Sequence, residues 1–383
     1  MGHWGNARQV MKLIGTGMRY RRLRVSGKPY RLESLSLEIT HRCICRCKMC
    51  NIWQIAPEVP DLELSVWQEL LYSPELYHLR ELDLTGGEPF LRRDMDKLLQ
   101  AICDAQPANF PGLRTLAITT NGILTDRILG LVRELIGQLQ KRGIDLVLAC
   151  GMDAVGGLHD RVRNYPGAWD KLQETLSGLF RIRETHANLI LGIKTTIIPL
   201  NTRELGRIAE YARANNLFTI ISPRIITANR FRNSDREKDL RFSPEDFREM
   251  IRFFESPDFP WIGHREALLG YLRTGTIRKP CSAGFNTLFI RYNGDVFPCP
   301  VMPVALGNIQ DQPLGELYRN ATATSFRKKV GSFPECGVCT EPGMERIAWP
   351  FEGFAFLRLA SRAGVRDFDR LVRHMGLDKY LGS

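Results

Sequence analysis

The stretch that decides the fold runs from Ser34 to Cys50 and reads SLSLEITHRCICRCKMC. Its first seven residues alternate between polar and apolar side chains, which is the pattern of a β-strand. Three cysteines follow directly, Cys43, Cys47 and Cys50, with the spacing C-x3-C-x2-C. A loop of this spacing can direct three thiolates at one small volume. Three thiolates on a four-iron cubane leave one iron open to bind and activate a substrate, whereas a fully ligated cluster only transfers electrons.

The alternative to an iron–sulfur cluster in this loop is a zinc site. Zinc prefers four ligands, and His41 or Cys45 could supply the fourth. The chain has ten cysteines, and its N-terminus lacks the apolar region of a signal peptide. Cysteines in this number without an export signal argue for metal binding in a reducing cytoplasm rather than for disulfides. The spacing favours the iron–sulfur cluster and leaves zinc open.

Outward from this stretch, short β-rich runs alternate with longer helical patterns, which is typical of βα units and a parallel sheet. The predicted strands are residues 34–40, 81–85, 115–120, 145–150, 189–197 and 218–222. The predicted helices between them are residues 65–72, 95–105, 125–142, 168–184 and 202–215. Six units are too few for a closed eight-stranded barrel. The sequence therefore predicts an α/β fold, a partial (β/α)6 TIM-like barrel with its site at the carboxyl ends of the strands.

Further motifs follow the second, third and fourth predicted strands. After the second strand comes Gly86-Gly87-Glu88-Pro89, in which glycines let the backbone approach a ligand and Glu88 can hold an ammonium group. The later motifs are Thr119-Thr120-Asn121-Gly122, Gly151-Met152-Asp153-Ala154 and His159-Asp160-Arg161-Val162-Arg163. Because the carboxyl ends of parallel strands meet at one edge, these loops are expected to face the cysteine loop.

These motifs together resemble the radical S-adenosylmethionine (SAM) superfamily, over roughly residues 34–230. The resemblance implies that Cys43, Cys47 and Cys50 hold a [4Fe–4S] cluster whose open iron binds SAM. The residues that it implies for SAM binding are Met49, Gly86, Gly87, Glu88, Asn121, Asp153 and Arg163. Reductive cleavage of SAM would give a 5′-deoxyadenosyl radical, which takes a hydrogen atom from the substrate.

The same resemblance assigns a role to each contact. The Gly-Gly-Glu loop would meet the methionine amino group and Arg163 its carboxylate, while Asn121 and Asp153 lie where the ribose is approached. Two positions depart from the family pattern. Met49 stands where an aromatic residue is usual, and its thioether can lie against adenine. Gly151 stands where a serine is usual and lacks the contact that the serine makes.

A second cysteine set follows further along the chain. A β-hairpin is predicted over residues 287–299 with its turn at Asn293-Gly294. Cysteines flank it in the pattern C-x12-G-x4-C, and a C-x2-C pair follows. This pattern resembles the SPASM/twitch domain and implies one auxiliary [4Fe–4S] cluster, held by Cys281, Cys299, Cys336 and Cys339. Four thiolates would leave no open iron, so this cluster is expected to accept or relay an electron. The alternative is a four-cysteine structural zinc site.

The remaining candidates have weaker signals. Cys103 falls on a predicted helix and Cys150 ends the fourth strand, so both are expected in the core. Cys45 is interpreted as a bystander inside the cysteine loop. Arg224, at the end of the sixth strand, is the candidate catalytic residue because it could reach a substrate; an ordinary surface arginine is the alternative.

The net charge of +11 is concentrated at the two ends of the chain. Residues 1–32 hold eight basic residues and no acidic one, and residues 346–383 hold seven basic and four acidic residues. A nucleic-acid partner is therefore not expected for the neutral body of the protein. The expected divisions are a basic amphipathic segment (1–33), the partial barrel (34–235), a helical linker (236–280), a small α+β auxiliary-cluster domain (281–345) and a basic aromatic tail (346–383).

Both charged ends also carry apolar residues at helical spacing. They are Val10, Met11, Ile14 and Met18 at one end, and Trp349, Phe351, Phe354, Phe356, Leu357, Leu359, Phe368, Leu371, Val372 and Met375 at the other. Either these faces pack on the barrel, or they dock on anionic lipid, as basic amphipathic helices do. We expect a cytoplasmic protein, which in the second case is peripheral at the inner membrane face.

The expected activity is that of a radical SAM enzyme, either an oxidoreductase or a catalyst of radical bond formation. It would need an external electron donor such as flavodoxin or ferredoxin. The leading substrate is a ribosomal peptide or protein. The alternatives are oxidation, or C–C or C–S bond formation, on a small alcohol, a sugar or a lipid-linked substrate. A non-catalytic iron–sulfur electron-transfer module is an alternative of another class, although it needs no Gly-Gly-Glu-Pro loop.

Overall fold

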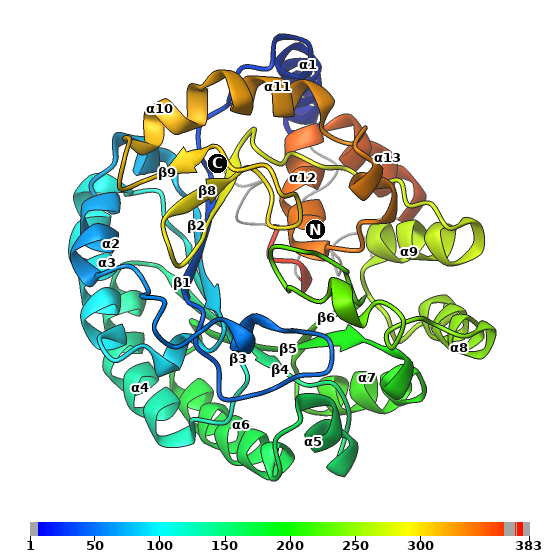
Figure 1. Ribbon diagram of the computed structural model, residues 1–383. Coiled ribbons are helices and arrows are strands. Elements are labelled where there is room, and N and C mark those ends of the chain that lie inside the picture. Colours follow the sequence, from blue (N-terminus) through cyan, green and yellow to red (C-terminus); the bar gives the residue numbers. More distant parts are fainter. Residues whose placement is uncertain (1–6, 364–371, 373, 378–383) are drawn as a thin grey trace.

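The computed structural model describes residues 7–363, 372 and 374–377, which are built around one twisted sheet (Figure 1). Within these residues the sheet has nine strands in the order β6-β5-β4-β3-β2-β1-β7-β8-β9. The strands are β1 Ser34–Thr40, β2 Glu81–Gly86, β3 Thr115–Thr120, β4 Asp145–Gly151, β5 Leu189–Ile197, β6 Phe218–Pro223, β7 Thr287–Ile290, β8 Asp295–Phe297 and β9 Gly307–Asn308. The first six are parallel and pair in sequence order, as expected of successive βα units.

Helices follow the barrel strands and cover the outer face of the sheet (Figure 1). They are α2 Leu64–Leu70, α3 Met95–Asn109, α4 Thr125–Lys141, α5 Gly157–Arg163, α6 Ala168–Thr185 and α7 Leu205–Ala214. In α4, the residues Ile128, Val132, Leu135 and Leu139 recur three or four positions apart and are all buried. This spacing places them on one helix face, which packs against the sheet.

The predicted fold class, an α/β partial barrel, is confirmed. All six predicted barrel strands are present, and their bounds differ from the predicted ones by at most one residue. The structure adds α5, which is not predicted from the sequence, and places α9 (Ile262–Thr274) within the span expected to be a helical linker. A 3-10 helix, Pro199–Glu204, precedes α7 where a continuous helix is predicted, because the Asn201 side chain bonds to the backbone around it and tightens this turn.

The predicted hairpin continues the barrel sheet rather than forming a separate one. β7 pairs with β1 in parallel, from Ser34 opposite Thr287 to Leu37 opposite Ile290, and β8 returns antiparallel to β7. Gly294 makes the turn between them with a φ of 89°, a conformation that glycine adopts at no steric cost. The region that holds the second cysteine set is therefore joined by hydrogen bonds to β1, the strand that leads into the first cysteine set.

The remaining helices lie beyond the barrel strands, several of them on the open side of the barrel (Figure 1). They are α8 Pro244–Glu255, α10 Leu314–Arg319, α11 Ala321–Lys329, α12 Pro342–Glu352 and α13 Phe354–Ala363, together with α9. In α12, Arg346 forms an ion pair with Glu81 of β2. Just before α12, the Thr340 hydroxyl donates to the carbonyl of Pro223 in β6 at 2.8 Å. This segment therefore closes the gap that six strands leave in the barrel.

The described part of the C-terminal tail packs on the body of the protein. Trp349, Phe351, Phe356 and Leu359 are all buried, as are Val372 and Met375. The packing alternative therefore holds for this part of the tail, while Phe368 and Leu371 lie outside the described residues. At the other end, the helix α1 (Ala7–Ser26) buries Leu13 and Tyr20 and leaves other apolar residues exposed. In the described part of the chain, no helix has the length and apolar character needed to cross a bilayer.

Candidate active site

The cysteine loop begins where β1 ends, at the carboxyl edge of the barrel. Cys45 and Cys47 are buried and Cys43 and Cys50 are half-buried, all as free thiols. Hydrogen bonds to Cys43 and Cys47 raise the pKa of Cys45. Burial raises the pKa of Cys50 to about 12, with a further contribution from Cys47. The predicted ligands Cys43, Cys47 and Cys50 therefore lie near one another, packed in one cluster with Cys45.

Gly86 and Gly87 bring the second loop against the cysteine loop. A Cβ on Gly86 would collide with the carbonyl of Thr40, and one on Gly87 with the carbonyl of Arg42. The two backbones are joined by hydrogen bonds from the Gly87 N–H to the Thr40 carbonyl, 2.9 Å, and from the Glu88 N–H to the Arg42 carbonyl, 2.8 Å. These glycines thus allow the backbone of the second loop to approach the cysteine loop closely. Their contact with SAM stays a prediction.

Glu88 is fully buried at the centre of this edge, and both of its carboxylate oxygens accept hydrogen bonds. Oε1 accepts from the Thr120 hydroxyl at 2.8 Å and the Phe90 N–H at 3.2 Å, and Oε2 accepts from the Asn121 N–H at 2.7 Å. Burial raises the pKa of Glu88 to about 7, although these donors favour its charged form. A buried carboxylate is costly unless it is paired with a cation, so Glu88 fits a site that the ammonium group of a ligand completes.

Arg163, the last residue of α5, reaches back across the end of β4. Its Nε lies 2.8 Å from Asp153 Oδ2, and its Nη1 lies 3.9 Å from Cys47 Sγ. Burial alone would lower the pKa of Arg163, but Asp153 and the neighbouring cysteines raise it further than burial lowers it. Gly151 provides the space for this arrangement, because a Cβ there would collide with the guanidinium. The structure therefore places a fixed cation beside the cysteine loop.

Asn121 and Met49 lie next to these groups. Asn121 is 5% exposed; its Oδ1 accepts from the Ile123 N–H at 2.9 Å, and its Nδ2 has no hydrogen-bond partner among the described residues. A buried polar group without a partner is uncommon in a folded protein. Met49 is buried in an apolar cluster with Ile123 and Ile198. Three thiols, a buried carboxylate, an arginine, an amide donor available to a ligand and an apolar surface fit a [4Fe–4S] cluster with SAM.

The second predicted set, Cys281, Cys299, Cys336 and Cys339, also lies in one region of the structure. Burial raises the pKa of Cys281 to about 12, and Cys339 and Cys336 add to this shift. Burial likewise raises the pKa of Cys299, with Cys281 and Cys339 adding to it. Within the described residues, no three metal-binding side chains converge on a single point. Thiolates on a cubane bind separate irons and so are spaced more widely than the ligands of one zinc ion. Buried neighbouring thiols suit a metal cluster that stabilises them as thiolates.

A buried cation adjoins this second set. Lys279 has a side chain that is 6% exposed, donates to the Glu341 carbonyl and lies 3.8 Å from Glu345. Glu345 in turn lies 2.6 Å from His264 Nδ1. Burial lowers the pKa of Lys279, but Cys339 and Glu345 raise it by more. Lys279 therefore carries a positive charge beside the predicted auxiliary cluster.

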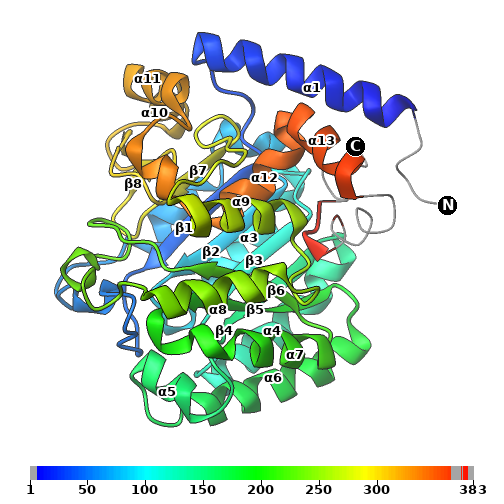
Figure 2. The ribbon, with the colours of Figure 1, turned by 90° about the vertical axis from the view of Figure 1, so that its right-hand side faces the viewer.

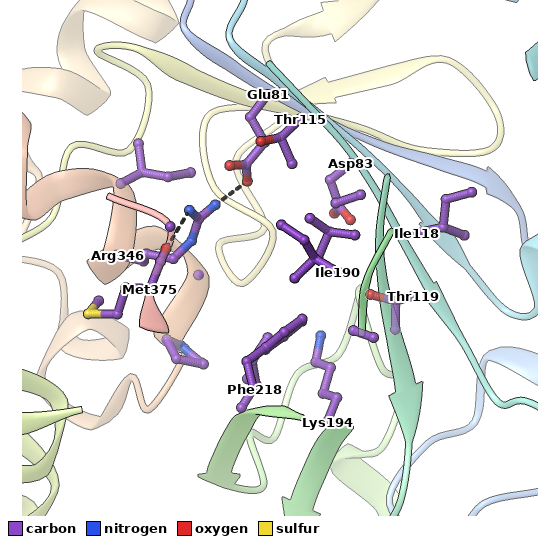
Figure 3. Close-up of a pocket in the computed structure, with 18 of the residues that line it drawn as sticks. Glu81, Asp83, Thr115, Ile118, Thr119, Ile190, Lys194, Phe218, Arg346 and Met375 are labelled. Atoms are coloured by element: carbon purple, nitrogen blue, oxygen red, sulfur yellow. Dashed lines mark hydrogen bonds and ion pairs between the residues drawn. The ribbon is translucent and has the colours of Figure 1, made fainter. Parts of the chain in front are cut away.

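The interior of the barrel contains a cavity of about 890 Å³ (Figure 3). The end of the cavity where the strands begin is lined by the first residues of several strands, among them Glu81 and Thr115. The ion pair between Glu81 and Arg346 lies on the side that α12 covers. Closed TIM barrels fill this interior with layers of bulky side chains. Here the interior is open and partly polar, so it can receive a ligand.

Two charged residues of this cavity, Asp83 from β2 and Lys194 from β5, point into it (Figure 3). The Ser36 hydroxyl donates to Asp83 Oδ2 at 2.6 Å. Burial raises the pKa of Asp83, and Ser36 and Lys194 oppose this shift. The Lys194 ammonium group makes no hydrogen bond or ion pair with the residues that the structure describes, although its charge acts on Asp83. It pairs in register with Gly151, which places it at the level of the Arg163 guanidinium.

Arg224 is not among the residues that line this cavity. Its Nε donates to the Leu240 carbonyl at 2.8 Å, and its guanidinium lies over the Phe242 ring at 4.9 Å. This geometry favours a structural role in holding the loop after β6. Cys103 and Cys150 are fully buried, in agreement with their predicted place in the core.

Three site residues are not singled out from the sequence: Asp83, Lys194 and Lys279. Lys194 had a signal, because it is the one charged residue in the otherwise uncharged strand LILGIKTTI. Lys279 had no signal in the sequence, because only the fold brings it close to Glu345 and the cysteines.

Comparisons with known proteins agree with this geometry. The radical SAM superfamily pattern matches residues 37–212, and the pattern of the SPASM iron–sulfur cluster-binding domain matches residues 281–341. The chain is 26% identical over 333 residues to the AdoMet-dependent heme synthase of Methanosarcina barkeri, covering 80% of this chain and 87% of that protein. It is 28% identical over 181 residues to the PqqA peptide cyclase of Methylocella silvestris, covering 47% of this chain and 44% of the cyclase.

The fold is also found among solved structures. The structure of anSMEcpe with bound AdoMet superposes with a TM-score of 0.59 at 15% identity, covering 90% of this chain and 98% of that one. At this identity the likeness shows the shared fold. The two domain matches cover both cysteine sets, and the fold is the partial barrel that they imply. The chain therefore belongs to the radical SAM enzymes and carries a SPASM domain, with SAM and [4Fe–4S] clusters as its cofactors.

Proposed function

We propose that this enzyme abstracts a hydrogen atom from a polar substrate that carries an anionic group and occupies the barrel cavity. A peptide or protein side chain is the substrate that we favour. When bound, the SAM-ligated cluster supplies the electron and the radical chemistry. The observation that carries the proposal is Lys194, whose ammonium group makes no hydrogen bond or ion pair with the described residues and is directed into an open cavity.

The cavity supports a bound substrate by its size and its lining. Its volume of about 890 Å³ lies within the range of ligand pockets, roughly 300–1,000 Å³. A cation inside a pocket of low dielectric attracts an opposite charge more strongly than it would in water. Lys194 would hold an anionic group at the level of Gly151, and Asp83 could orient a donor on the same ligand. The substrate would then lie inside the barrel, next to the SAM site at the carboxyl edge of the strands.

The relatives support two classes of substrate. The PqqA peptide cyclase is named for a peptide, and a carboxylate side chain or chain end would pair with Lys194. The heme synthase match covers far more of the chain and supports a small molecule as a second candidate. Either class would need an anionic group to satisfy Lys194. Sugars and neutral alcohols lack this group and fit the cavity less well.

For the SPASM region we propose a relay of the electron that leaves the oxidised substrate. Four cysteines, Cys281, Cys299, Cys336 and Cys339, would ligate one auxiliary cluster completely. Such a cluster has no open iron and transfers electrons. A protein such as flavodoxin or ferredoxin would supply the electron for SAM cleavage.

The test uses the reconstituted enzyme with SAM and a reductant under anaerobic conditions. Host extract is separated into a peptide fraction and a small-molecule fraction, and the formation of 5′-deoxyadenosine is measured with each. We expect the peptide fraction to stimulate it, and Lys194→Met to lose this stimulation. Lys171→Met, which changes an exposed lysine of α6, is the matched control. Stimulation by the small-molecule fraction alone would overturn the peptide assignment, and equal stimulation of both variants would overturn the role of Lys194.

A further inference from the structure

We propose that the outer face of α1 docks this enzyme on a membrane surface that contains anionic lipid. The proposal rests on the arrangement of exposed apolar and basic residues on one helix, and it is independent of the substrate. Seven large apolar side chains are exposed in the described part of the chain, and four of them lie on α1. They are Val10, Met11, Met18 and Val25, which are 39%, 65%, 50% and 82% exposed.

Three of these four residues form one stripe. Met11, Met18 and Val25 are spaced by seven residues, so they lie on the same side of the helix, two turns apart. From Met11 to Val25 the stripe is about 21 Å long at the rise of an α-helix. Gly15, which lies between the first two, has open space where a side chain would project. The stripe is thus long, narrow and unobstructed.

The opposite face of α1 is fixed to the protein. Leu13 and Tyr20 are 4% and 6% exposed, and the Tyr20 hydroxyl donates to the Cys281 carbonyl at 2.7 Å. Gly17 lies against the ring of Phe354 in α13. Figure 2 shows α1 along the edge of the molecule, with α11 and α13 on its inner side. The outer face therefore needs no rearrangement before it meets a partner.

Basic residues flank the stripe. Arg19, Arg21 and Arg22 are exposed; the Arg19 guanidinium lies over the Tyr30 ring at 5.0 Å and that of Arg21 over the Phe354 ring at 4.6 Å. Exposed Lys328 and Lys329 of α11 extend the basic surface near the end of α1. Guanidinium groups held at the sides of an apolar stripe can bind phosphates while the stripe enters the interface.

The charge pattern selects anionic lipid over the other possible occupants. Residues 1–32 hold eight basic residues and no acidic one, so two copies facing each other here would repel. An acidic protein would satisfy the charges, but a straight apolar stripe about 21 Å long fits a flat, extended interface better. Anionic lipid satisfies both features, because its headgroups attract the arginines and its acyl chains accept the methionines and valines.

The test is co-sedimentation of the reconstituted enzyme with vesicles of phosphatidylcholine alone or mixed with phosphatidylglycerol. We expect binding to the mixed vesicles that weakens with added salt, and little binding to phosphatidylcholine alone. The triple variant Met11→Gln, Met18→Gln, Val25→Gln and the single variant Arg22→Gln should each weaken this binding, the triple variant by about tenfold or more. Tyr72→Gln with Tyr77→Gln, which removes exposed apolar residues elsewhere, is the matched control and should bind as the unchanged protein does.

SAM cleavage and iron content are measured on the same samples. Both should be unchanged in the α1 variants, because the substituted side chains face solvent. Absence of binding to the mixed vesicles at low salt would overturn the proposal. Equal binding of the triple variant and the unchanged protein would overturn it as well, as would binding to both vesicle types that is insensitive to salt. A defect in SAM cleavage would instead bear on the radical chemistry, so the two failures are distinguishable.

Discussion

The guanidinium of Arg163 occupies the space that a side chain on Gly151 would fill. From there Arg163 pairs with Asp153 at 2.8 Å and reaches the thiol of Cys47. Gly151 departs from the family pattern, in which a serine is usual. The structure gives a physical reason for the departure, since the missing Cβ leaves room for the Arg163 guanidinium beside the last residue of β4. We infer that this arginine takes over the contact that the serine makes in relatives.

Gly151→Ala should therefore displace Arg163 and weaken SAM binding. We expect the affinity to fall by about tenfold or more, equivalent to about 1.4 kcal/mol, with iron content retained. Isothermal titration with SAM measures the affinity. Gly137→Ala is the matched control, because Gly137 lies in α4 with open space around it. SAM affinity equal to that of the unchanged enzyme in Gly151→Ala would contradict the role given to Arg163.

Replacing Cys43, Cys47 and Cys50 together with alanine should remove one of two clusters. The reconstituted enzyme should hold about eight irons and the variant about four, and the variant should no longer cleave SAM. Iron analysis and 5′-deoxyadenosine formation measure the two effects. Cys45→Ala should keep its iron, because Cys45 is predicted not to be a ligand. Full iron content in the triple variant would show that the first cluster is assigned to the wrong residues.

SAM binding should depend on pH through Glu88. An ionised carboxylate is needed to hold an ammonium group, and burial raises the pKa of Glu88 to about 7. Affinity should therefore fall as the pH drops through 7, by up to about tenfold per pH unit below it. Without SAM the sign is reversed: the raised pKa stabilises the fold at low pH, and this contribution is lost as the pH rises through about 7. Glu88→Gln should bind weakly at every pH, whereas exposed Glu58→Gln should keep the pH dependence. A flat profile in the unchanged enzyme would refute this role.

The two cysteine sets should have separable functions. Cys336→Ala combined with Cys339→Ala should still allow SAM cleavage, because the SAM-binding iron lies in the other set. The same variant should lose substrate turnover, since the electron from the substrate has no acceptor. Zinc instead of iron in the SPASM region of the purified enzyme would rule out the relay.

Lys279 should set the potential of the auxiliary cluster. A buried cation stabilises the reduced, more negative state, so Lys279→Met should lower the midpoint potential, by about 59 mV or more if the one-electron equilibrium changes tenfold. Lys279→Arg should keep most of the potential, and Lys171→Met, which changes an exposed lysine of α6, should leave it unchanged. Redox titration followed by electron paramagnetic resonance measures it. An unchanged potential in Lys279→Met would show that Glu345 already neutralises this charge.

The sequence by itself determined the chemistry and the barrel. The cysteine spacing, the Gly-Gly-Glu-Pro loop and the alternation in residues 34–40 are local features, and local backbone and side-chain preferences express them directly. The predicted strand bounds agree with the structure to within one residue because short apolar runs end at clear polar motifs. Parallel strands bring their carboxyl ends to one edge, so the sequence alone assigns residues as distant as Cys43 and Asp153 to one site.

Only the tertiary structure decided the contacts that depend on packing between distant segments. The sequence does not show that β7 joins β1, that α12 closes the open side of the barrel, or that Lys279 lies beside the second cysteine set. It predicts a common apolar face for Val10, Met11, Ile14 and Met18, but the fold decides which side of α1 is covered. Tyr20 and Leu13 pack inward because they meet the SPASM region and α13, and this leaves Met11, Met18 and Val25 facing solvent. The physical reason is the same in each case. Whether a residue is buried depends on both of the surfaces that come into contact, and a local stretch of sequence contains only one of these surfaces.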